Sequence, residues 1–117
     1  MKNKSSVPVW FLSMVLSGAA AAACEKPTAP AIPDGATADE DAMIDAQHAV
    51  KDYMAKADQY LDCVVNENKA AQADGTDTPE SKQARSSGYE EVFKARETVP
   101  GSFNGELRKF KARPDQQ

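Results

Sequence analysis

The chain is poor in the side chains on which most catalytic and metal sites depend. Its 117 residues include one histidine, His48, and two cysteines, Cys24 and Cys63. It has no Cys-x-x-Cys pair, no haem-attachment motif and no glycine-rich loop that would cradle a phosphate. On one straight helix, His48 and Cys63 would lie about 22 Å apart, which excludes catalysis by that pair. Cys24 could approach His48 only by giving up a bond to Cys63. The sequence therefore predicts a protein that is not an enzyme and has no cofactor.

Large apolar side chains are scarce as well. Beyond residue 23 the chain has only 12 Ile, Leu, Val and Phe residues, and no stretch there is apolar enough to span a membrane. A domain with so thin a core is marginal on hydrophobic burial alone and benefits from a covalent staple or a partner. We therefore expect an unknown protein partner or a homo-oligomer.

The first 23 residues have the order of a cleavable secretory signal. Two lysines begin it, residues 7–16 are mostly apolar, and residues 19–23 are all alanine. The alanines fit the A-x-A rule in two registers, which places cleavage after Ala22 or Ala23. The apolar stretch has about ten residues, whereas a membrane-spanning helix needs roughly 20. The chain is thus expected to be exported, and to be periplasmic or secreted.

Cleavage would leave an acidic protein. The whole chain has 14 Lys and Arg against 18 Asp and Glu, and the signal takes away Lys2 and Lys4, so the net charge falls from −4 to −6. Nucleic-acid binding is driven by neutralising phosphates with basic side chains. We expect no nucleic-acid partner, and no membrane contact of the mature form unless Cys24 is lipidated.

Three fates are open to the two cysteines, both of which survive cleavage. An even count in an exported protein favours a Cys24–Cys63 disulfide. Residues 24–36 form a Pro-rich arm. In polyproline II form its stretch from Cys24 to Gly35 covers roughly 34 Å, close to the rise of about 39 Å along a helix over residues 37–63. Alternatively, Cys24 is the acylated residue of an envelope lipoprotein, although Ala21 stands where such signals normally have leucine. In the third case both thiols are free.

The rest of the chain predicts an all-α fold. Thr37 and Glu40 form a capping box, which begins a long helix that ends at about Ala71. Apolar residues then recur at alternating spacings of three and four, which is typical of a buried helical stripe. The stripe consists of Met43, Ala46, Val50, Tyr53, Ala57, Tyr60 and Val64, and it is widened by Met54 and Leu61.

A second helix and a short third helix are predicted after the loop at residues 73–77. Thr78 is suited to cap the second helix, with Pro79 at its first position. Pro100 ends this helix after Val99, and a short C-terminal helix follows to about Ala112. The better apolar face of the second helix carries Tyr89, Val92, Phe93 and Arg96. The prediction is a helical hairpin within a domain of residues 37–112, with residues 113–117 as a tail.

Two constellations on these helices invite a functional interpretation. Asp41, Asp45, His48 and Asp52 share one face of the first helix, but one helix does not surround an ion, and this face lies away from the stripe. We therefore predict no metal site. Tyr53, Tyr60 and Tyr89 have the spacing of ordinary core residues whose hydroxyls reach solvent.

Four segments of the mature chain carry a resemblance to a known family. They are Cys24–Pro27, Ile32–Gly35, Tyr60–Cys63 and Phe103–Lys111. Together they resemble a family of small exported helical proteins of Gram-negative bacteria, of unknown function. The resemblance implies export to the periplasm and supports pairing of Cys24 with Cys63, and it implies no activity.

Overall fold

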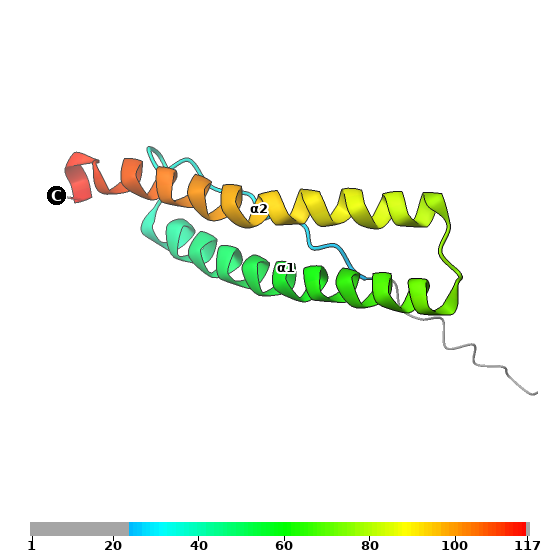
Figure 1. Ribbon diagram of the computed structural model, residues 1–117. Coiled ribbons are helices and arrows are strands. Elements are labelled where there is room, and N and C mark those ends of the chain that lie inside the picture. Colours follow the sequence, from blue (N-terminus) through cyan, green and yellow to red (C-terminus); the bar gives the residue numbers. More distant parts are fainter. Residues whose placement is uncertain (1–23, 117) are drawn as a thin grey trace, which may run out of the picture.

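The computed structural model describes residues 24–116, so the signal peptide expected at residues 1–23 lies outside the described residues. Within this range the fold is all-helical, as predicted. Helix α1 spans Glu40–Asp74, helix α2 spans Pro79–Lys111, and a 3-10 turn, η1, spans Pro114–Gln116. The two long helices pack as a hairpin, and the arm of residues 24–36 runs beside them (Figure 1). A turn and the N-cap residue then lead into α1.

Helix α1 begins later than the capping box predicts. Its N-cap is Asp39, whose side chain accepts a hydrogen bond of 2.8 Å from the backbone N–H of Ala42. Thr37 is instead part of a turn in which its own N–H and that of Ala38 donate to the carbonyl of Asp34, at 3.1 and 2.8 Å. The expected cap at Thr37 is therefore wrong, because the turn after Asp34 uses that residue and Asp39 stands closer to the helix.

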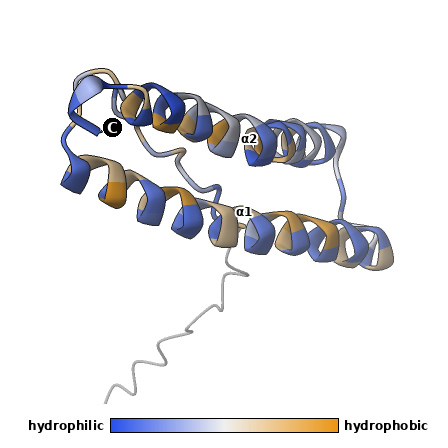
Figure 2. Cartoon of the chain, turned by 90° about the vertical axis from the view of Figure 1, so that its left-hand side faces the viewer, coloured by the Kyte–Doolittle hydropathy of each residue, from blue (hydrophilic) through white to orange (hydrophobic). Residues whose placement is uncertain are grey.

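The apolar stripe predicted for α1 is confirmed as the core. All seven of its residues are buried, and Leu61, predicted to widen it, is buried too. From α2 the buried residues are Val92, Val99, Phe103 and Phe110. Hydrophobic and hydrophilic segments alternate along both helices in Figure 2, as expected for helices that each bury one stripe. The core is thus a single seam between two helices, closed at one end by the arm.

The helix predicted to end at Val99 continues to Lys111 with Pro100 inside it, so the separate third helix is wrong. A proline within a helix removes one hydrogen bond and costs about 3 kcal/mol. Val99 and Phe103, on either side of Pro100, are both buried. Burying two such side chains contributes about 1.5 to 3 kcal/mol each, which offsets the proline and keeps the helix continuous.

Arg85 fastens the end of the hairpin at which the loop of residues 75–78 joins α1 to α2. Its Nε donates to Asn68 Oδ1 of α1 at 2.8 Å, and its Nη2 donates to Asp77 Oδ1 of the loop at 2.6 Å. The side chains of Arg85 and Asp77 are only 11% and 12% exposed. Thr78 caps α2 by accepting from the Ser81 N–H, and Pro79 follows it, both as predicted. These contacts hold the first half of α2, whose sequence has poor helix formers.

Gly88 in that first half leaves space for Tyr60. A Cβ atom added at Gly88 would lie 2.2 Å from the Tyr60 hydroxyl oxygen, whereas one added at Gly101 of the same helix would meet nothing within 4 Å. Gly88→Ala is expected to lower the free energy of unfolding by about 1 to 3 kcal/mol through overpacking. Gly101→Ala should raise it by about 0.5 to 1 kcal/mol, because alanine favours a helix.

Urea unfolding followed by circular dichroism measures both changes. Adding Tyr60→Phe to Gly88→Ala should recover part of the loss, since the obstructing hydroxyl is then gone. Equal stabilisation by the two glycine substitutions would show that Gly88 has no packing role.

Candidate functional site

The candidate site consists of the Pro-rich arm, the groove between the arm and α1, and the side of the hairpin that the arm does not cover. At its start, Cys24 is joined to Cys63 of α1 by a disulfide, with the two Cα atoms 5.7 Å apart. The predicted disulfide is therefore confirmed, and no free cysteine is present in residues 24–116. Cys63 in this bond is no nucleophile, and the Cys24 sulfur is committed to the same bond.

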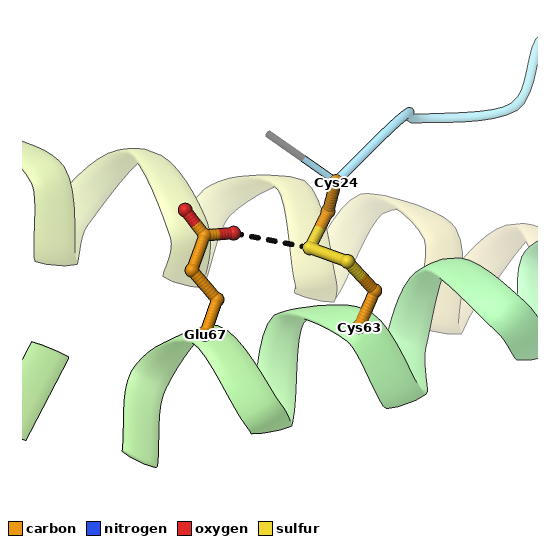
Figure 3. Close-up of a disulfide and its surroundings, with 3 residues drawn as sticks. All are labelled: Cys24, Cys63 and Glu67. Carbon is orange, nitrogen blue, oxygen red and sulfur yellow. Dashed lines mark hydrogen bonds between the residues drawn. A yellow bond between two sulfur atoms is a disulfide. The ribbon is translucent and has the colours of Figure 1, made fainter. Parts of the chain in front are cut away.

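A carboxylate that the sequence analysis did not single out lies against this disulfide. Glu67 Oε2 is 3.0 Å from Cys24 Sγ, and the contact is dashed in Figure 3. A disulfide sulfur carries no proton, so it gives the carboxylate no hydrogen-bond donor. Glu67 follows Cys63 by four residues, one helical turn, and this spacing is the sequence signal that places both on one face of α1.

The other end of the arm is held by the C-terminal part of α2. Buried Gly35 donates its N–H to Glu106 Oε2 at 2.8 Å. A Cβ at Gly35 would lie 1.8 Å from the Glu106 carbonyl oxygen, so only glycine fits there. Arg113 stacks over the Phe110 ring and donates to the carbonyl oxygens of Gly35 and Ala38. Arg113, the first residue of the C-terminal tail, thus docks on the end of the arm.

Between its two ends the arm makes one ion pair across to α2. Lys26 Nζ donates to Glu91 Oε2 at 2.7 Å, and this carboxylate raises the pKa of Lys26. Both side chains are largely exposed, so water screens the pair and it contributes little to stability.

A groove of about 710 Å³ lies between the arm and α1. Pro27 and Pro30 of the arm border it, and buried Tyr53 and Tyr60 line it from α1. The two tyrosines are core residues, as predicted, and burial raises the pKa of Tyr53. The groove is lined by no histidine and no free thiol. Charged side chains, including Lys26, Asp52 and Lys56, also border the groove.

The acidic face predicted to be solvated is exposed along α1, and it comprises Asp41, Asp45, His48 and Asp52. Among residues 24–116, potential metal-ligating atoms of at least three side chains gather elsewhere, at Cys24, Cys63 and Glu67. Phe93 differs from its expected role as a core residue, because its side chain is 57% exposed. Its ring stacks on that of half-buried Tyr89, with the centroids 6.0 Å apart and the planes 12° apart.

Neither long helix of the described chain has a stretch apolar enough to cross a membrane. Comparisons with protein-family models, with curated proteins and with solved structures find no match for the chain. The resemblance drawn from the four sequence segments therefore stays a prediction.

The contact between Gly35 and Glu106 makes the docking of the arm sensitive to acid. The pKa of Glu106 is lowered by hydrogen bonds from Lys109 and from the Gly35 N–H. A lowered folded-state pKa means that this contact contributes stability above the pKa of an unfolded glutamate and is lost as the pH falls through the folded value. The amide resonance of Gly35 should therefore shift during an acid titration followed by NMR, with a midpoint below 4.5.

Glu106→Gln should abolish this titration of the Gly35 amide. Asp39→Asn is the matched control, since it removes a carboxylate at the other side of the same turn and should leave the Gly35 midpoint in place. A Gly35 midpoint that follows Asp39 instead of Glu106 would contradict the assignment.

Proposed function

We propose that the chain is an exported, non-enzymatic protein that binds a protein partner or a second copy of itself through the flank of the hairpin that carries Phe93. The stacked pair of exposed Phe93 and half-buried Tyr89 carries the proposal. Large aromatic side chains dominate the energy of protein interfaces, and a pair already stacked loses little conformational freedom on binding.

Helical geometry places a second exposed apolar residue on this flank. Val65 follows the buried Val64 of α1, and Phe93 follows the buried Val92 of α2, each by one residue or 100° around its helix. In an antiparallel pair, this rotation turns both residues toward the same side of the seam. The arm lies on the opposite side, where it bonds to Cys63 and Glu91.

The open flank therefore combines Val65, 41% exposed, with Phe93 and Tyr89. Clustered apolar groups of this kind favour contact with another protein surface, whereas a single exposed apolar residue means little. The thin core adds support, because a partner would bury apolar surface that the hairpin leaves in water.

Export is supported by the signal pattern of residues 1–23 and by the disulfide. Disulfides persist in oxidising compartments outside the cytoplasm and are rare inside it. Acylation of Cys24 would need the same sulfur atom that bonds to Cys63, so the lipoprotein alternative and the stapled arm exclude each other.

Intact mass spectrometry of the protein exported from its own signal, without reductant, tests the first half of this proposal. The expected mass is that of a chain beginning at Ala23 or Cys24, lighter by two hydrogens because of the disulfide. A precursor mass would contradict export. Acyl chains on Cys24 would place the protein on a membrane and leave Cys63 as a free thiol.

The interaction surface is tested by a photo-crosslinking residue at position 93, with position 94 as the control. Lys94 is also exposed on α2, but it lies on the outer face of the helix, away from both the seam and the flank. Adducts or a crosslinked dimer are expected from position 93 and not from position 94. If self-association occurs, Phe93→Ala should weaken it in analytical ultracentrifugation at micromolar concentrations, whereas Lys94→Ala should not.

A strict monomer that gives no position-93 adduct in the host envelope would overturn the proposed surface. Adducts of equal yield from both positions would mean that the contact does not depend on Phe93.

A further inference from the structure

The sulfur atoms of Cys24 and Cys63 and a carboxylate oxygen of Glu67 lie within 4.8 Å of one another. The three side chains come from two elements, the start of the arm and one turn of α1. Figure 3 shows the Glu67 carboxylate directed at the Cys24 sulfur. Among residues 24–116, the Glu67 carboxylate forms no ion pair and accepts no hydrogen bond from a protein N–H or O–H group.

We propose that reduction of the Cys24–Cys63 disulfide creates a binding site for a thiophilic divalent cation such as Zn²⁺, with Cys24, Cys63 and Glu67 as ligands. The oxidised chain would not bind the cation there, because the metal ligand is the thiolate and a disulfide has none. The proposal departs from the sequence prediction of no metal site, which did not bring Glu67 together with the cysteines. It does not depend on the flank that carries Phe93.

The chemical steps balance with a dithiol as the reductant. The dithiol gives two electrons and two protons to the disulfide and becomes a disulfide itself, leaving thiols at Cys24 and Cys63. The cation then displaces both thiol protons to solvent and binds two thiolates and one carboxylate. A water molecule completes the four-coordinate shell that Zn²⁺ favours.

Distances within the cluster suit such a shell. Zn²⁺ binds sulfur at about 2.3 Å and carboxylate oxygen at about 2.0 to 2.2 Å, which sets neighbouring ligand atoms roughly 3.5 to 3.8 Å apart in a tetrahedron. The ligand atoms of the oxidised chain lie within 4.8 Å of one another, and two of them are the bonded sulfur atoms, which must move apart after reduction to reach this spacing. Rotation of the Cys24 and Cys63 side chains about their Cα–Cβ bonds provides that movement. Cys63 and Glu67 are one turn apart on a rigid helix, which limits the freedom lost when they bind.

Charge favours a cation once the disulfide is open. Two thiolates and a carboxylate in so small a volume repel one another, and a divalent cation removes that repulsion. After reduction, the far end of the arm stays in place, because the Gly35–Glu106 hydrogen bond and the hydrogen bonds from Arg113 hold it there. Near Cys24 the exposed Lys26–Glu91 pair holds the arm only weakly, so the cation itself is expected to keep Cys24 beside Cys63 and Glu67.

The test titrates Zn²⁺ and Co²⁺ into the full mature chain. A neutral phosphine serves as reductant because, unlike a thiol, it does not compete for zinc through sulfur. The reduced protein should bind one Zn²⁺ per chain by calorimetry and should give a thiolate-to-cobalt charge-transfer band with Co²⁺. The oxidised protein should show neither.

Glu67→Gln should weaken Zn²⁺ binding by the reduced protein. The expected loss of affinity is about 10-fold to 100-fold or more. Removal of a group that only supports a metal ligand has an effect in this range, and removal of a direct ligand should weaken binding at least as much. Asp62→Asn is the matched control, since Asp62 is an exposed carboxylate next to Cys63, and it should leave the affinity unchanged. Far-UV circular dichroism verifies that each reduced variant keeps its helices.

Three results would overturn the proposal. Reduced protein that binds no Zn²⁺ lacks the site, and equal binding by oxidised protein places the metal elsewhere. Equal affinity of Glu67→Gln and the parent chain removes Glu67 as a ligand. If reduction unfolds the helices and Zn²⁺ does not restore them, the three ligands are not held together and the site does not form.

Discussion

The covalent bond between Cys24 and Cys63 fixes the position of the arm, and the surface of the hairpin is divided accordingly. The bond spans 39 residues of sequence, and in the chain-entropy model closing a loop of that size contributes on the order of 4 kcal/mol. The Lys26–Glu91 pair is too exposed to replace it. Because the arm is tied to one side of the seam, that side gains the groove over Tyr53 and Tyr60, and the other side is left open.

The chain has few large apolar residues, and this shortage explains why α2 continues through Pro100, which by itself favours the end of a helix. With a core only one seam deep, each buried side chain is a large fraction of the total, so the helix cannot end at Pro100 without withdrawing Phe103 and Phe110 from α1. The helix-breaking effect of one proline is smaller than the burial that a continuous helix secures. The close fit of Gly88 over the Tyr60 hydroxyl has the same physical basis. Because Gly88 has no side chain, the two helices approach closely although few large side chains lie between them.

Sequence patterns predicted the parts of the fold that depend on short-range periodicity. The stripe of α1, the cap at Thr78 and the all-helical hairpin follow from spacings of a few residues, and the reach of the arm followed from simple lengths. Apart from the Cys24–Cys63 disulfide, contacts between residues far apart in the sequence could not be predicted. The bond of Gly35 to Glu106 and the docking of Arg113 depend on the register between arm and α2, which no local pattern encodes. Phe93 was expected on one apolar face with Tyr89 and Val92, but it lies 100° around the helix from buried Val92 and is exposed outside the seam.

The chemical state of Cys24 distinguishes the roles proposed for this chain. Its sulfur can be acylated, bonded to Cys63 or bound to a cation, and any one of these excludes the other two. In the folded chain Cys63 lies within bonding distance, so in an oxidising compartment the disulfide is the outcome that the fold favours. In the reduced state, the negative charge of Glu67 repels two thiolates that have no metal ion bound to them. The same charge attracts a cation that lies between the thiolates and the carboxylate. Because Glu67 lies one helical turn from Cys63, the redox state of the disulfide decides whether a cation can bind between the two side chains.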